Sequence, residues 1–261
     1  MQASIRLDAT PPVDYLLRLG DSCLVLGQRL AEWCGHAPVL EEDIALANMA
    51  LDLIGQSRAL LTLAGQREGE GRGRAYDEDQ LAFLREERDY RNVTLVELPR
   101  GDFAFTVLRN AMVATWLRLL WEGLAESSDV ELAAIAGKAV KEARYHAEHA
   151  GDWVVRLGDG TAESHRRAAA ALARVWRYVP ELFEDDAVDA AAAASGLGPR
   201  ASEIEPAWRA EIGALLQEAT LAVPADSAFR SHGKRGVHTE HMGYLLAEMQ
   251  HLQRSYPGGV W

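Results

Sequence analysis

Apolar residues recur every three to four positions along almost the whole chain, and this spacing is the strongest constraint on its fold. Such a period places apolar side chains on one face of a helix, whereas the alternation of β-branched residues that is typical of strands is nearly absent. The pattern therefore predicts an all-α protein. Because 48% of the 261 residues are apolar and no long linker interrupts the pattern, residues 1–261 are predicted to form a single helical domain.

Glycine, proline and acidic residues mark the ends of the predicted helices, and we expect four long helices at the centre. The expected helices cover residues 13–33, 40–65, 79–90, 101–125, 129–157, 162–183, 187–194, 206–222 and 237–254. Residues 66–78 contain three glycines among charged side chains, so this segment is predicted to be a mobile loop.

Charge and cysteine usage bound the function. A formal net charge of -12 argues against broad nucleic-acid binding, which requires clustered lysine and arginine. No run of eighteen apolar residues is present, and no basic segment followed by an apolar run opens the chain, so neither a membrane span nor export is expected. Cys23 and Cys34 fit neither a disulfide framework nor a zinc site, and we expect two buried thiols in a cytoplasmic protein.

His146 lies in the middle of the apolar stripe of helix 129–157, with Glu142 one turn earlier. A lone histidine on an apolar face is more typical of a core residue than of a metal ligand, and we predict a hydrogen bond between His146 and Glu142. Helix 40–65 places Leu53 on its buried stripe and Gln56 on the flank. The interior of that helix therefore offers an amide and no carboxylate.

Two further groups of residues could carry chemistry. His238, His241 and Glu248 are spaced as metal ligands on one helix, although the periodicity does not bring them to one point. Lys234 and Arg235 form a basic loop flanked by glycines in an acidic chain, which indicates either a contact for an anionic group or a capping loop with solvated charges.

Several segments carry a resemblance to one family. They are LRLGDSCLVLGQRL (17–30), AEWCGHAP (31–38), DIALAN (43–48), LDLIGQ (51–56), KEARYH (141–146), HTEH (238–241) and LAEMQ (246–250). Together they closely resemble the C-subunit family of the bacterial ring 1,2-phenylacetyl-CoA epoxidases, over nearly the whole chain. The segment EWCGHAP is long enough to be highly specific.

The resemblance implies a ferritin-like four-helix bundle with additional helices, which acts as the non-catalytic partner of an A subunit. In that family the A subunit holds a di-iron centre through two Glu-x-x-His motifs, and an iron-sulfur flavoprotein reductase supplies electrons from NADPH. Matched onto those motifs, the ligand positions here are Leu53, Gln56, Ala143 and His146. A bundle di-iron site needs a glutamate at the first position of each motif, so no metal or other cofactor is expected in this chain.

The resulting hypothesis is a structural subunit that positions the A subunit within a hetero-oligomer or homo-oligomer. The loop at Lys234 and Arg235 is then a candidate contact for a partner subunit or for coenzyme A. The alternative is an autonomous metal-binding oxidoreductase using His238, His241 and Glu248, with His146 as a further ligand. A storage or binding bundle is disfavoured, because ferroxidase chemistry needs the carboxylates missing at positions 53 and 143.

Overall fold

A computed structural model describes residues 3–259, and within that range the chain is all-α as predicted, with a single isolated bridge between His232 and Val237 as its β feature. The α-helices are α1 (Pro11–Ala31), α2 (Leu40–Gly69), α3 (Glu78–Phe83), α4 (Thr94–Glu97), α5 (Phe103–Leu124), α6 (Val130–Gly158), α7 (Ala162–Trp176), α8 (Pro180–Phe183), α9 (Ala187–Ser195), α10 (Ala201–Glu218) and α11 (Glu240–Ser255). Two 3₁₀ turns are η1 (Glu87–Asp89) and η2 (Gly233–Arg235).

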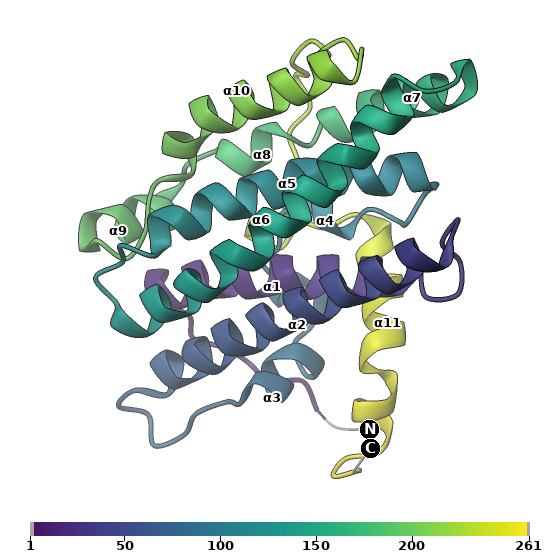
Figure 1. Ribbon diagram of the computed structural model, residues 1–261. Helices are drawn as coiled ribbons and strands as arrows, with labels where there is room; N and C mark the ends of the chain where they lie inside the picture. The colour runs from purple at the N-terminus through teal and green to yellow at the C-terminus, as the bar shows by residue number, and fades with distance from the viewer. Residues whose placement is uncertain (1–2, 260–261) are drawn as a thin grey trace.

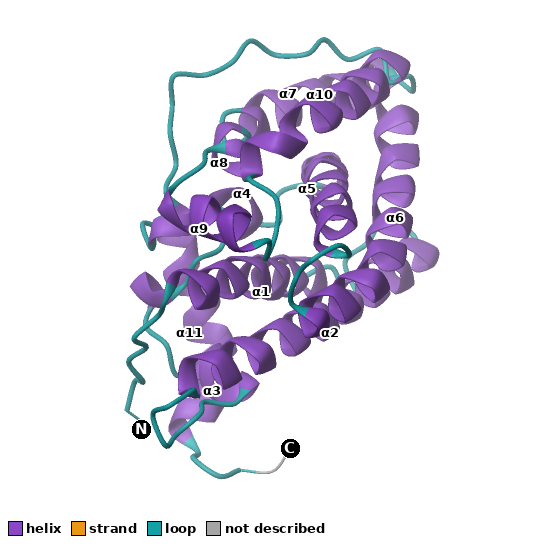
Figure 2. Cartoon of the chain, turned by 90° about the vertical axis from the view of Figure 1, so that its left-hand side faces the viewer, coloured by secondary structure: helices purple, strands orange, loops and turns teal. Residues whose placement is uncertain are grey.

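Four long helices make the centre of the molecule. Helix α1 packs along α2, α5 packs along α6, and contacts between α2 and α6 join the two pairs (Figure 1). Helices α7 and α10 cover α5 and α6 from the other side, and α9 packs on α1. The loop after α10 crosses the top of the molecule before the chain returns to α11 (Figure 2). Buried apolar residues from α1 through α11 form one continuous core.

Helix α5 is long and apolar enough to cross a membrane by length and composition, but 83% of its most apolar window is buried inside the protein. It therefore serves as the core helix around which α6, α7 and α10 pack. Close packing elsewhere in the centre depends on small residues. A Cβ atom added at Gly27 of α1 would lie 3.2 Å from the carbonyl oxygen of Ala50 in α2, so glycine permits the two backbones to approach.

Several predicted helix boundaries differ from the observed ones. The predicted helix 79–90 is two elements, α3 and η1, and the predicted helix 162–183 breaks after Trp176 before Pro180 begins α8. Helix α10 begins at Ala201, ahead of the predicted start at Pro206, because the side chain of Asp185 accepts hydrogen bonds from the backbone and hydroxyl of Ser202 in the first turn.

Three further predictions need correction. Helix α2 continues to Gly69, into the segment predicted as a loop, and Glu68 is buried there against Arg72 and Arg74. Helix α4 was not predicted, since four residues are too few to show a period. Both cysteines are free, but Cys34 is exposed and not buried.

Candidate functional site

The four positions that the resemblance matches to di-iron ligands all lie in the interior, on α2 and α6. Leu53 and Ala143 are each 1% exposed, Gln56 is 5% exposed and His146 is 4% exposed. Gln56 is therefore more deeply buried than was predicted, since the sequence placed it on the flank of the helix. Two hydrogen bonds cross the seam between the helices: Gln56 Nε2 donates to Glu142 Oε2 over 2.9 Å, and His146 Nε2 lies 3.0 Å from Asp52 Oδ2.

The predicted hydrogen bond between His146 and Glu142 is wrong. Asp52 takes the imidazole, and Glu142 accepts from the amide of Gln56 instead. Both changes have the same cause, since α2 packs against α6 and supplies a closer acceptor for the ring and a donor for the carboxylate. Cys23 of α1 approaches the same amide, with its Sγ 3.6 Å from Gln56 Oε1. The polar groups of Cys23, Gln56 and Glu142 are thus joined in one set of contacts, and those of Asp52 and His146 in another.

The protonation of His146 follows from its burial. Desolvation disfavours the imidazolium and lowers the pKa of His146 below its ordinary value, although the hydrogen bond to Asp52 offsets part of that effect. At neutral pH the ring is uncharged, and the tautomer with a proton on Nε2 donates to the Asp52 carboxylate. Burial also raises the pKa of the Cys23 thiol, so this group stays protonated.

The residues of this seam do not fit a di-iron centre. Leu53 and Ala143 carry no donor atom, Gln56 offers a neutral amide, and His146 is engaged with Asp52. Two hard cations need several carboxylates around them to balance their charge. Among residues 3–259, no group of three histidine, cysteine, aspartate or glutamate side chains is placed to hold a metal ion.

The structure does not bring His238, His241 and Glu248 together. The side chain of His238 is fully enclosed, with Nδ1 2.7 Å from Glu97 Oε2 and Nε2 3.2 Å from the carbonyl oxygen of Tyr90. His241 is partly exposed, with its Nε2 3.8 Å from the neighbouring Glu240, and Glu248 points to solvent. The residue that sequence reasoning missed is Glu97, which lies 141 positions from His238.

The pairing of His238 with Glu97 makes the stability of the fold depend on pH. Burial by itself disfavours the imidazolium, but the Glu97 carboxylate outweighs burial and raises the pKa of His238 above its ordinary value. The folded protein therefore holds this proton more tightly than the unfolded chain does. The stabilisation is complete below the unfolded pKa of about 6.5 and is lost as the pH rises through the folded pKa.

We expect His238→Asn to destabilise the protein most at acidic pH. The difference from wild type in the free energy of unfolding should shrink as the pH is raised from about 6 to about 9. Urea unfolding at a series of pH values measures it, with the exposed His251→Asn as the control that changes little. A difference that stays constant across this range contradicts the assignment.

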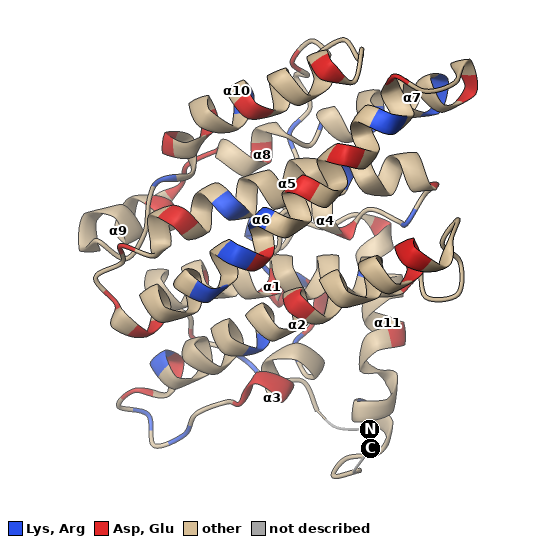
Figure 3. Cartoon of the chain, in the orientation of Figure 1, with Lys and Arg blue, Asp and Glu red and all other residues tan. Residues whose placement is uncertain are grey.

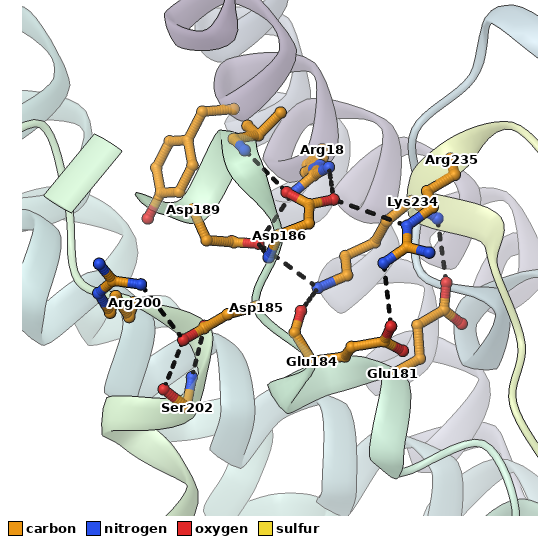
Figure 4. A network of polar contacts seen from close by, with 12 residues as sticks. Arg18, Glu181, Glu184, Asp185, Asp186, Asp189, Arg200, Ser202, Lys234 and Arg235 are labelled. Atoms are coloured by element: carbon orange, nitrogen blue, oxygen red, sulfur yellow. Dashed lines mark hydrogen bonds and ion pairs between the residues drawn. The ribbon is translucent and has the colours of Figure 1, made fainter. Parts of the chain in front are cut away.

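The basic loop is held inside a network of charged side chains (Figure 4). Lys234 Nζ donates to the carbonyl oxygen of Glu184 over 2.6 Å and lies 3.9 Å from Asp189 Oδ2. Arg18 of α1 bridges Asp186 and Asp189 at the start of α9. Burial lowers the pKa of Lys234, with the Asp189 carboxylate opposing that shift.

The expectation of two solvated charges in this loop therefore needs correction. The side chain of Lys234 is 9% exposed, and the backbone N–H of the same residue donates to Glu181. Arg235 is the member of the pair that reaches solvent, and it forms an ion pair with Glu184 at 2.9 Å. The loop is first of all a structural link that ties the chain before α11 to α1, α8 and α9.

These features define an all-helical protein with four long central helices, whose seam is closed by hydrogen bonds at the positions of the expected ligands. The chain belongs to the family of phenylacetic acid catabolic proteins, which matches residues 2–261. It is 50% identical over 247 residues to the C subunit of the 1,2-phenylacetyl-CoA epoxidase of Escherichia coli (strain K12), across 95% of this chain and 98% of that protein. The resemblance predicted from the motifs is confirmed.

Proposed function

We propose that this chain is the structural C subunit of a phenylacetyl-CoA epoxidase in phenylacetate catabolism. In this proposal one ferritin-like domain binds and positions a catalytic A subunit that holds the di-iron centre, while a reductase subunit supplies electrons. The chain itself carries no metal and works in the cytoplasm, without nucleic acid or membrane. Membership of the family and the identity to the Escherichia coli protein support the assignment to this enzyme.

The seam between α2 and α6 is the observation that carries the non-catalytic role. Leu53 and Ala143 replace the carboxylates that a di-iron site needs, and both side chains are buried in the core. Burying Leu53 stabilises the fold by about 1.5–3 kcal/mol. A charged ligand at the same position would lose this stabilisation if no metal were bound. The interior of this chain is thus suited to rigidity, and its function is expected at the surface.

An exposed apolar face on α2 is evidence that a partner subunit binds there. Leu40 is 72% exposed, Ile44 is 53% exposed and Leu51 is 66% exposed. Their spacing of four and seven residues places them within about 40° of one another around the helix. Tyr145 on the neighbouring α6 is also half exposed. A stripe of large apolar side chains that faces solvent marks a protein interface more often than a free surface.

The test is co-purification of the chain with its A subunit. We expect Ile44→Glu together with Leu51→Glu to weaken the complex by at least about a hundredfold, since buried charges in an interface cost several kcal/mol. The matched control is Val223→Glu together with Tyr244→Glu, which makes the same change at exposed apolar residues of the loop after α10 and of α11. An unchanged complex with the α2 variant removes this face from the proposal, and no complex with the wild-type chain removes the scaffold role.

Of the two basic loop residues, Arg235 remains the proposed contact for a partner or for coenzyme A. Its guanidinium is 48% exposed, whereas Lys234 is engaged inside the network. Arg235→Glu is the variant to include in the same co-purification and in turnover assays of the assembled enzyme.

A further inference from the structure

A second basic region lies along α7. Two neighbouring hollows, of about 280 Å³ and 340 Å³, share Phe105 and Arg174 in their linings. The first is bounded by Arg177 and Tyr178 at the end of α7, by Leu98 before α5, and by His241 in the first turn of α11. Helix α7 and the residue after it carry four arginines and one acidic residue, in a chain whose net charge is -12. Figure 3 shows arginine segments in blue near the start of α7. Positive side chains are thus concentrated where the rest of the surface is acidic.

Arg174 and Arg177 have free hydrogen-bonding edges. Among residues 3–259, neither forms an ion pair with a carboxylate, unlike the two arginines at the start of α7, which pair with Glu163. Stacking nevertheless holds both in place. The guanidinium carbon of Arg174 lies 5.0 Å from the ring centroid of Phe105, and that of Arg177 lies 4.0 Å from the ring centroid of Phe229. Stacked guanidinium planes leave their N–H groups directed outward.

A buried arginine contacts two of the residues that line the first hollow. Arg109 of α5 has no exposed surface and donates to the carbonyl oxygen of Leu98, while its guanidinium lies 5.9 Å from the Phe105 ring centroid. Its Nε and Nη2 atoms have no hydrogen-bond partner among the described residues. Burial, and next the neighbouring Arg29, lowers the pKa of Arg109 to about 9, so the group stays mostly charged at neutral pH.

This buried charge calls for an anion nearby. A buried cation without a close counter-ion is costly. Among the described residues no carboxylate forms an ion pair with Arg109, and the Glu32 carboxylate offsets its charge only in part. Arg109 is linked to the hollow through Leu98, whose carbonyl oxygen accepts its hydrogen bond, and through the ring of Phe105, since both of these residues line the hollow. An anion bound in that hollow would partly offset the charge of Arg109. The exposed Arg174 and Arg177 would hold the anion by charge-assisted hydrogen bonds.

We propose that the hollow lined by Arg174, Arg177 and His241 binds the phosphate group of a small organic phosphate. A phosphate monoester carries close to two negative charges and three acceptor oxygens, which matches the two guanidiniums and the imidazole that line the hollow better than one carboxylate does. The second hollow shares Phe105 and Arg174 with the first, and it is the space next to the site for the organic part of the ligand. This site is separate from the α2 face and does not depend on the epoxidase assignment.

Isothermal titration of the full chain tests the proposal, with coenzyme A, adenosine 3′,5′-bisphosphate and inorganic phosphate as separate probes. We expect saturable binding that weakens as salt is added, and a loss of at least about tenfold in affinity for Arg174→Gln together with Arg177→Gln. Arg58→Gln together with Arg144→Gln removes two exposed charges from α2 and α6 and should leave affinity unchanged. Thermal unfolding verifies that both double variants are folded.

The three probes separate the sources of the phosphate. Tighter binding of the esters points to a nucleotide-like ligand, and equal or tighter binding of inorganic phosphate points to the free ion; both results support the site when Arg174 and Arg177 are required. No binding by any probe, or equal losses in the two double variants, overturns the proposal. The proposal is also overturned if no phosphate binds and the Arg174→Gln, Arg177→Gln variant assembles less well with a partner subunit. That result would indicate that the two arginines bind an acidic segment of the partner.

Discussion

Asp21→Ala is expected to lower the free energy of unfolding by about 3–5 kcal/mol, and the Tm by about 10 °C. Asp21 of α1 and Arg85 after α3 are both fully buried and form a two-pronged ion pair, in which Arg85 Nη1 donates to Asp21 Oδ2 over 2.9 Å. The same oxygen accepts the backbone N–H of Arg91 over 2.8 Å. Removing the carboxylate leaves a buried guanidinium without its counter-ion.

Urea unfolding measures the change in the free energy of unfolding, and two control variants show whether it comes from the buried ion pair. Asp8→Ala removes an exposed carboxylate that pairs with Arg72 and should change stability by no more than about 1 kcal/mol. Asp21→Asn combined with Arg85→Met removes both charges and should cost less than Asp21→Ala alone, since no unpaired charge remains. A cost below about 1 kcal/mol for Asp21→Ala would contradict the buried pair.

Leu53→Glu is expected to lower the free energy of unfolding of the isolated chain by about 3 kcal/mol or more, because it places a carboxylate in the core without metal or cation. Leu53 lies on the inner side of α2, where a Cβ added at Gly27 of α1 would meet its Cβ at 3.5 Å. Leu53 is 1% exposed, so a charge at this position is cut off from solvent. Urea unfolding of the metal-free protein measures the loss.

Leu51→Glu is the matched control, since it makes the same change two residues away on the exposed side of α2. We expect it to change the stability of the isolated chain by about 0.5 kcal/mol or less. Leu53→Met keeps the volume and should cost less than about 1.5 kcal/mol. If Leu53→Glu is tolerated as well as Leu51→Glu, position 53 is not part of a closed core.

Helix starts could be predicted where a local side chain caps them. Asp102 accepts the N–H of Phe105 at the start of α5, and Asp129 accepts those of Glu131 and Leu132 at the start of α6. These contacts span two or three residues, so the sequence alone displays them. For the same reason, burial of Leu53, Ala143 and His146 was predicted from helical period and is confirmed.

The partners of polar residues could not be predicted in this way. Period indicates which side of a helix faces inward, but it does not indicate which helix lies opposite. His146 meets Asp52 across 94 positions, and His238 meets Glu97 across 141. Lys234 looked like a surface residue because lysine seldom is buried, and its partners in α8 and α9 come from more than forty positions away.

The most direct test of a metal-free structural subunit is the iron content of this chain alone and of its complex with the A subunit. The account predicts less than about one tenth of an iron per copy of the isolated chain, since leucine and alanine occupy positions 53 and 143, where a di-iron site requires carboxylates. It also predicts one di-iron centre for each A subunit in the complex. Stoichiometric iron in the isolated chain, lost when His146 or His238 is replaced, would contradict it.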